Sequence, residues 1–258
     1  EIEMNEDCLW LNVWTPAKTA DEKLPVFVWF FGGGLQVGNP AEMEFDGERI
    51  ARRGIVVVTM CYRLNMFGFM CHPEITAENP EAPANFGLLD QRMAMQWVKD
   101  NIEAFGGDAD NITIGGQSAG GGSVLNQILH GSKGIFKRAV CHSGMFYMPG
   151  NNIMNPRTLK YAEKLGEYFF NFCGAKSLAD MRKFTTAELR QKWDEYGGFG
   201  KSIATWLPVR DDKFICHELF EAMETNTIPY VPLMTGFTTD EFRYVPEGMD
   251  KKDGDISA

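Results

Sequence analysis

The hydrophobic and polar positions of the chain form two kinds of segment, short apolar runs and longer stretches with helical spacing. The apolar runs are rich in β-branched and aromatic residues, which is typical of buried strands. They span residues 8–15, 24–31, 55–62, 111–114, 137–141 and 230–235. The first run differs from the others because its apolar and polar side chains alternate up to Pro16, as in a half-buried strand.

The clearest helical spacing lies in residues 85–105. Trp97, Val98 and Ile102 fall on one face of this predicted helix, and two glycines stop it at position 106. Further helices are predicted at residues 45–53, 123–130, 156–172, 177–184, 186–196 and 217–225. Residues 71–83 are rich in Pro and Glu and are predicted to form a loop.

Strands that alternate with amphipathic helices predict an α/β fold, with a mostly parallel sheet covered by helices on both faces. We expect residues 1–258 to form a single domain. The helices predicted at about 150–205 would form an insertion that makes the wall or lid of a pocket. Ligands of such folds bind at the carboxyl ends of the strands. The glycines at 32–34, Ser118 and the segment after Thr235 all occupy such ends.

Composition excludes some function classes. A net charge of −10 argues against nucleic-acid binding, which needs a basic face. No apolar run reaches the length of a membrane span. The six cysteines show no spacing typical of a metal site, and no disulfide pair is evident. A cytoplasmic location is therefore favoured over secretion, although the chain begins abruptly in a charged segment and the compartment stays open.

Two glycine-rich segments resemble nucleotide-binding motifs without matching them. Residues 197–202 look like a phosphate loop, but position 195 is Glu where the pattern needs Gly. The glycines at 32 and 34 follow a strand, but Val37 stands where the dinucleotide fingerprint needs its third glycine. We predict neither a nucleotide nor another cofactor.

Residues 111–123 combine a strand, the motif G-x-S-x-G and the start of a helix. This order is the nucleophile elbow of a serine hydrolase, with Ser118 as the nucleophile. A Cβ atom at Gly116 or Gly120 would clash with the closely approaching segments around the turn. Because the chain holds 27 glycines, the motif by itself is also compatible with a glycine-rich connection in which Ser118 only caps a helix.

Six longer segments carry a resemblance to a known family. These are EDCLWLNVWTP at 6–16, LPVFVWFFGGGLQVG at 24–38, GIVVVT with YRLNMFGF at 54–69, NFGLLDQ at 85–91, FGGDADNITIGGQSAGGGSV at 105–124 and TGFTTDEF at 235–242. They resemble, in order and spacing, the type-B carboxylesterase family of the α/β-hydrolase fold, which includes cholinesterases and para-nitrobenzyl esterases. The resemblance implies a small-molecule carboxylic ester as substrate.

The resemblance also implies residue roles. Ser118 would attack the ester carbonyl and form an acyl-enzyme. The backbone N–H groups of Gly33, Gly34 and Ala119 would form the oxyanion hole. Glu241 would orient the catalytic histidine, and the adjacent Asp240 is the alternative residue for this role. From the residues alone, Glu241 is also compatible with a solvent-exposed loop carboxylate that has no catalytic role.

Further positions match supporting sites of the family or depart from them. Ser143 matches a serine beside the triad, or is simply a strand-end hydroxyl bonded to backbone. Gln117 stands where cholinesterases carry Glu, which disfavours a cationic ester, and Asn65 replaces a usual Gly. Cys8 matches a cysteine whose disulfide partner in secreted relatives lies upstream of Glu1. Candidates for an aromatic substrate pocket are Phe146, Tyr147, Phe199 and Trp206, although core packing is the favoured interpretation of each.

The general base is missing from its expected place. A serine hydrolase of this fold carries its triad in the order Ser, Asp or Glu, His, yet no histidine follows Glu241. His142 is the nearest substitute because its strand should neighbour the elbow strand. The preferred interpretation is that the chain is an internal fragment whose base lies in a missing C-terminal segment, a segment that would be its partner.

Two functions are compatible with these features. The first is a serine esterase that needs the missing segment, since losing one triad member costs several orders of magnitude in rate. The second is a non-catalytic binding or adhesion protein on the same fold. Retention of the serine, the glycines and the acid favours the enzyme.

Overall fold

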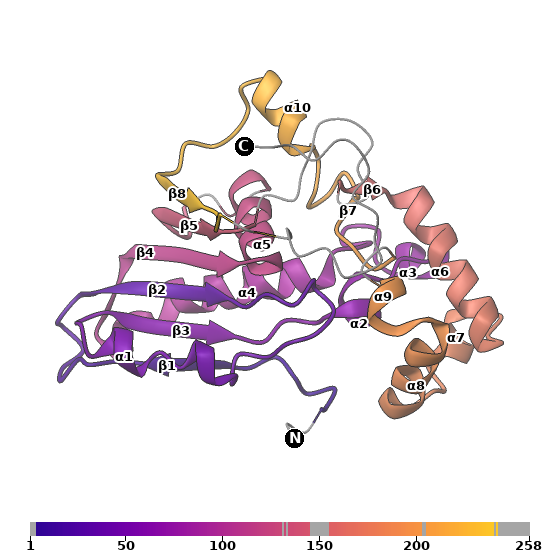
Figure 1. Ribbon diagram of the computed structural model, residues 1–258, viewed down its shortest axis with the longest axis horizontal. Helices are drawn as coiled ribbons and strands as arrows, with labels where there is room; N and C mark the ends of the chain where they lie inside the picture. The colour runs from indigo at the N-terminus through magenta and orange to yellow at the C-terminus, as the bar shows by residue number, and fades with distance from the viewer. Residues whose placement is uncertain are drawn as a thin grey trace.

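The computed structural model describes residues 4–130, 132, 134–144, 155–202, 205–239 and 241. Its centre is a six-stranded sheet in the order β1-β3-β2-β4-β5-β8 (Figure 1). The strands are β1 Leu11–Trp14, β2 Leu24–Phe30, β3 Val56–Met60, β4 Gly107–Gln117, β5 Arg138–His142 and β8 Leu233–Gly236. β1 is antiparallel to β3, and the other neighbours are parallel. The mostly parallel α/β sheet expected from the sequence is thus confirmed.

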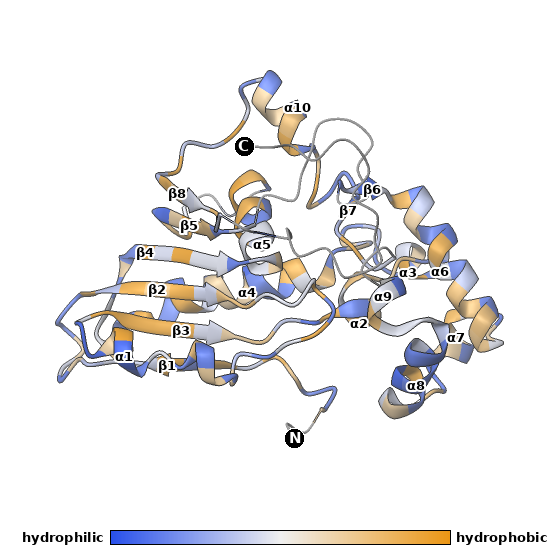
Figure 2. Ribbon diagram, viewed as in Figure 1, coloured by the Kyte–Doolittle hydropathy of each residue, from blue (hydrophilic) through white to orange (hydrophobic). Residues whose placement is uncertain are grey.

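Helices cover the sheet on both faces, as the alternating pattern predicted. On one face, α4 Phe86–Asn101 and α5 Ala119–Leu129 pack against alternate strand residues such as Val28 and Ile114, which are fully buried. On the other face, the short helix α1 Glu48–Ala51 lies over β3, where a Cβ atom at Gly47 would come within 2.8 Å of Val57. Figure 2 shows the apolar character of the central strands between these layers.

Several predicted elements have different bounds or a different type. The predicted loop at 71–83 contains a helix, α3 Pro73–Glu78, because the His72 side chain accepts a hydrogen bond from the Glu74 N–H and Pro73 starts the first turn. The predicted helix at 45–53 divides into the 3-10 turn η1 Met43–Phe45 and α1. The predicted helix at 85–105 ends its α-helical part at Asn101 and continues as the 3-10 turn η2 Ile102–Phe105. A short helix, α2 Asn65–Phe69, was not predicted.

A group of helices lies beside the carboxyl ends of the strands (Figure 1). It comprises α6 Leu159–Cys173, α7 Leu178–Met181, α8 Thr186–Tyr196 and α9 Gly198–Ser202. α8 begins with a capping box between Thr185 and Glu188. The glycine-rich stretch that resembles a phosphate loop forms α9. The two-stranded sheet of β6 Arg157–Thr158 and β7 Val209–Arg210 joins this group to the rest of the chain.

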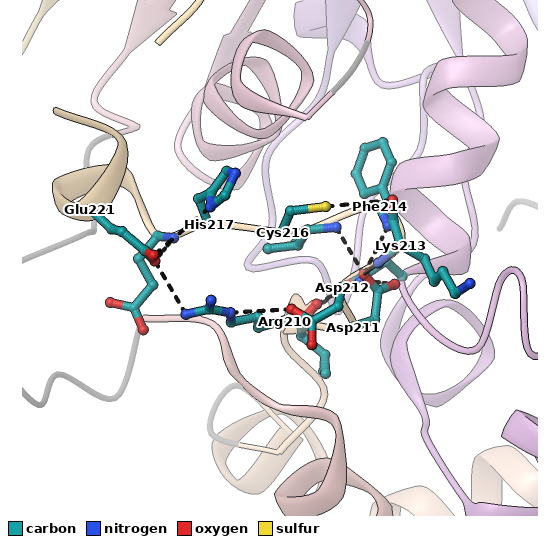
Figure 3. Close-up of polar contacts among 12 residues, drawn as sticks. Arg210, Asp211, Asp212, Lys213, Phe214, Cys216, His217 and Glu221 are labelled. Carbon is teal, nitrogen blue, oxygen red and sulfur yellow. Dashed lines mark hydrogen bonds and ion pairs between the residues drawn. The ribbon is translucent and has the colours of Figure 1, made fainter. Parts of the chain in front are cut away.

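Asp211 fixes the segment that follows β7. One of its carboxylate oxygens accepts hydrogen bonds from the N–H groups of Lys213, Phe214 and Ile215, and the other accepts from Asn85 at 2.9 Å. Figure 3 shows this turn beside Arg210, which reaches Glu221 of α10 Leu219–Glu224 at 3.2 Å. These contacts hold the segment containing Trp206 and β7 against the start of α4.

The strand β8 forms one edge of the described sheet, next to β5. All four of its residues are exposed, including Leu233 and the 60% exposed Met234. The predicted strand at 230–235 is therefore present, but it starts three residues later and ends one residue later than predicted. Among the described residues, no helix has the length and apolarity needed to cross a bilayer.

Candidate active site

Ser118 occupies a strained turn between β4 and α5. Its φ of 57° and ψ of −127° lie in a region that side-chain-bearing residues rarely adopt. The backbone N–H of Ser118 donates to the carbonyl oxygen of His142 at 2.9 Å, which ties the turn to the end of β5. The predicted helix thus starts at Ala119, four residues earlier than the sequence indicated.

The glycines around Ser118 are required by close backbone contacts. A Cβ atom at Gly116 would lie 2.4 Å from the backbone of Gly120. A Cβ atom at Gly120 would lie 2.1 Å from the carbonyl oxygen of Phe30. Since real Cβ atoms do not approach backbone so closely, both positions exclude any larger residue, and the serine turn presses directly against the end of β2.

The glycine run after β2 lies against the same turn. A Cβ atom at Gly32 would meet the Gln117 carbonyl oxygen at 2.8 Å and the Ser118 Cβ atom at 3.1 Å. Gly33 and Gly34 follow with φ values of 105° and 66°. The structure therefore places the start of the glycine run, at Gly32, against the predicted nucleophile, although the two segments lie more than 80 positions apart in the sequence.

One side-chain hydroxyl and one backbone N–H hold this glycine loop in place. The buried Tyr62 hydroxyl donates to the Phe31 carbonyl oxygen at 2.7 Å. The Asn65 N–H donates to the Leu35 carbonyl oxygen at 2.7 Å. Asn65 has a φ of 45°, a left-handed conformation that Asn tolerates better than most residues, which explains why it can stand where the family pattern has Gly.

Glu241 lies at the carboxyl end of the sheet, after β8. Its carboxylate accepts a hydrogen bond from the Ser143 hydroxyl and another from the Thr238 N–H at 3.1 Å. These hydrogen bonds favour the ionised form, and they hold the pKa of Glu241 below its ordinary value, with Ser143 as the larger cause. Ser143, which was expected only to lie beside the triad, thus contacts Glu241 directly.

An open hollow of about 590 Å³ lies between the ends of β4, β5 and β8. It is lined by Gln117, His142, Ser143, Gly236, Phe237, Thr238 and Glu241. Gln117 is exposed, so a neutral amide rather than a charge borders the hollow next to Ser118. The sequence did not single out Thr238 or Phe237, although both belong to the TGFTTDEF segment that pointed to Glu241.

His142 lines the hollow together with Gln117. The two residues are paired in the register between β4 and β5, so their side chains lie on the same face of the sheet. Its ring lies 6.4 Å from that of Trp29. Successive residues of a strand point to opposite faces, so this ring is directed away from the face on which α5 follows Ser118.

The other three histidines lie elsewhere. His72 stacks on Phe170 at 3.8 Å, His130 ends α5, and His217 lies near Glu221. None of these three lines the hollow beside Glu241.

The remaining predicted site residues lie in different places. Ala119 is 8% exposed at the first position of α5. Trp206 is 1% exposed in an apolar cluster that also holds Leu35, Phe31 and Ala119, while Phe199 is on the surface. Phe146, Tyr147 and Asp240 lie outside the described residues. Among the residues described, no three His, Cys, Asp or Glu side chains form a group that could hold a metal ion.

Comparisons with known proteins agree on one family. The carboxylesterase family profile matches residues 1–257. The bile salt-activated lipase of Bos taurus is 41% identical over 227 residues, which cover 82% of this chain and 37% of that protein. The para-nitrobenzyl esterase of Bacillus subtilis (strain 168) is 34% identical over 244 residues, which cover 92% of this chain and 47% of that protein.

The structural comparison gives the same result. A solved structure of a PNB esterase superposes with a TM-score of 0.80 at 31% identity and covers 94% of this chain and 51% of that one. The chain spans about half, or less, of the length of these relatives. On the matched profile, the relatives and the shared architecture, the chain belongs to the carboxylesterase family and has the α/β-hydrolase fold.

Proposed function

We propose that the protein is a serine hydrolase of carboxylic esters in which Ser118 is the nucleophile. The observation that carries the proposal is the strained Ser118 turn, against which Gly32 packs at a distance that only glycine permits. The Ser118 hydroxyl oxygen forms a bond to the ester carbonyl carbon, and its proton passes to a base. The alkoxide leaves with a proton, and water then cleaves the acyl-enzyme to the free acid.

The backbone N–H groups of Gly33, Gly34 and Ala119 would stabilise the oxyanion that forms in each of these two steps. The positive φ values of Gly33 and Gly34 and the absence of side chains there support this role, because the substrate oxygen must approach bare backbone. One such donor contributes on the order of 10²–10³ in rate.

Glu241 would orient a histidine base supplied by the remaining segment of the same protein. Its ionised form, favoured by Ser143 and the Thr238 N–H, suits the stabilisation of an imidazolium. The exposed Gln117 beside the nucleophile carries no charge, which favours small neutral esters over cationic ones.

The alternative is a non-catalytic binding protein on the same fold. Binding alone does not require a serine in a strained conformation or glycines packed closely around it. Such strain lowers the free energy of unfolding by about 1–3 kcal/mol per residue. Retention of both, together with Glu241, supports the enzyme.

The test is hydrolysis of p-nitrophenyl acetate by the full-length polypeptide that contains this chain, compared with its Ser118→Ala variant. We expect turnover by the parent and loss of at least about 10³-fold in the variant. A fluorophosphonate probe should label Ser118 in the parent. A full-length protein that neither turns over the ester nor reacts with the probe would leave the binding function as the better interpretation.

A further inference from the structure

Gln36 joins two parts of the chain that flank the proposed oxyanion hole. Its side-chain amide nitrogen donates to the carbonyl oxygen of Trp206 at 2.8 Å and contacts that of Gly34 at 3.3 Å. Trp206 lies 170 positions further along the chain. Gln36 is 1% exposed, so these contacts form away from solvent.

The orientation of this amide is set by its partners. Both neighbours offer carbonyl oxygens, which only accept hydrogen bonds, so the NH₂ group must face them. The amide oxygen of Gln36 is then buried without a hydrogen-bond partner among the described residues, and so is the indole N–H of Trp206. A buried polar atom without a partner opposes folding. Stability alone therefore does not explain a glutamine here.

The contacts of the glycine loop divide into two groups. Tyr62 and Asn65 hold the backbone of Phe31 and Leu35 against the segment that follows β3. Gln36 instead reaches toward the Trp206 segment, which Asp211 and Asn85 secure at its other end through the Val209 backbone. The distance between the loop and Trp206 thus depends on the Gln36 amide.

We propose that Gln36 is a positioning residue that aligns the backbone donors of Gly33 and Gly34 with the wall containing Trp206. It would thereby govern both the rate of acyl transfer and the choice of acyl chain. This inference rests on the proposed ester hydrolysis. Trp206 belongs to the same apolar cluster as Leu35 and Ala119, so a shift of this wall changes the space beside the acyl-enzyme.

The first test compares Gln36→Met with Gln127→Met in the full-length protein. Methionine keeps the length and apolar stem of glutamine and removes its hydrogen bonds. Gln127 is a matched control because it is fully buried, donates to the Leu88 carbonyl oxygen at 2.8 Å and lies outside the proposed site.

We expect Gln36→Met to lower kcat by about tenfold, less than the loss of one whole oxyanion donor, with KM changed less than about twofold. The ratio of kcat/KM for p-nitrophenyl butyrate to that for the acetate should also change. Gln127→Met should lower Tm and leave kcat and the ratio unchanged. A Gln36→Met enzyme with the kinetics of the parent would overturn the proposal.

A second measurement does not depend on activity. Amide hydrogen exchange of this chain should become faster in Gln36→Met both at residues 32–37 and at residues 205–209, because the link between them is lost. Gln127→Met should leave both segments unchanged. Faster exchange in one segment only, or in neither, contradicts the link. A parent without esterase activity would refute the proposed function, while the exchange data would still decide whether Gln36 joins the two segments.

Discussion

The hydroxyl group of Ser143 donates a hydrogen bond to the carboxylate of Glu241, which lies 98 positions later in the chain. Ser143 follows β5 and Glu241 follows β8, and these two strands are parallel neighbours. The contact therefore depends on strand order, because parallel neighbours bring their carboxyl ends to one edge of the sheet. The same edge carries Ser118 at the end of β4.

Replacing Ser143 with Ala should raise the pKa of Glu241 toward its ordinary value, because the larger of the two stabilising hydrogen bonds is lost. The ionised carboxylate is the form that supports a histidine base, so the acid limb of kcat/KM in the full-length protein should move to higher pH. Glu241 stays ionised at neutral pH in both enzymes, so the loss expected there, about tenfold in kcat/KM, comes from weaker positioning of the carboxylate and not from its protonation. A Ser143→Ala enzyme with an unshifted acid limb would show that this hydroxyl does not tune Glu241.

Relief of strain at Ser118 should be measurable as stability. Ser118→Ala and Ser118→Gly both remove the hydroxyl, but only Gly adopts a φ of 57° with a ψ of −127° without steric cost. We expect Ser118→Gly to have a free energy of unfolding about 1 kcal/mol higher than Ser118→Ala, since strain of this kind exceeds the entropy cost of Gly. Urea denaturation of the two variants provides the measurement. Equal midpoints would mean that the turn is unstrained.

Substitution of Gly120 should be far more disruptive than substitution of Gly200. A Cβ atom at Gly120 would lie 2.1 Å from the Phe30 carbonyl oxygen, whereas at Gly200 in α9 nothing lies within 4 Å. Gly120→Ala should destabilise the fold by about 3 kcal/mol. Gly200→Ala should stabilise it by up to about 1 kcal/mol, because Ala favours a helix. Thermal denaturation of both variants checks the contrast, and similar Tm changes would argue against the close contact.

His142 should be dispensable as a base. Its ring lies on the sheet face of Gln117 and Trp29, whereas its backbone carbonyl is what contacts the Ser118 turn. The fluorophosphonate labelling rate of full-length His142→Ala should therefore remain within about twofold of the parent rate, in contrast to the several orders of magnitude expected for loss of a triad member. A large drop in labelling, with an unchanged Tm, would make His142 the base.

Stability should fall as the pH drops below 6.5 because of His130. Burial, with a smaller contribution from the neighbouring His217, lowers the pKa of His130 to about 4. In the unfolded state His130 becomes protonated as the pH falls through about 6.5, whereas in the folded state it stays neutral until about pH 4. The free energy of unfolding is therefore highest above pH 6.5 and decreases below it. One such group changes the free energy of unfolding by about 2 kcal/mol between pH 7 and pH 5.

Urea denaturation at these two pH values checks the role of His130. The difference should shrink in His130→Gln, which cannot titrate in this range. His72 also has a pKa lowered by burial, so a smaller dependence should persist in that variant. An identical pH dependence in the parent and the variant would contradict the assignment.

Local chemistry made much of the fold predictable. The β-branched runs of β2 and β3 and the periodic face of α4 are properties of neighbouring residues, and the structure confirms these elements with small differences in their ends. The helix α3 was missed because its start depends on one side-chain contact of His72, which composition does not reveal. Ser118 could also be named from the sequence through its local motif, and Glu241 through the family resemblance of its segment.

Tertiary structure decided what those residues contact. No local pattern places Gly32 against Ser118, Ser143 on Glu241, or Gln36 on Trp206, because each pair is joined by the order of strands and the packing of distant segments. The sequence by itself determined which chemical groups are present and which segments are strands or helices. Their distances were set by the close packing of the sheet, since only glycine fits where an added Cβ atom would come within 2–3 Å of the backbone of a distant segment.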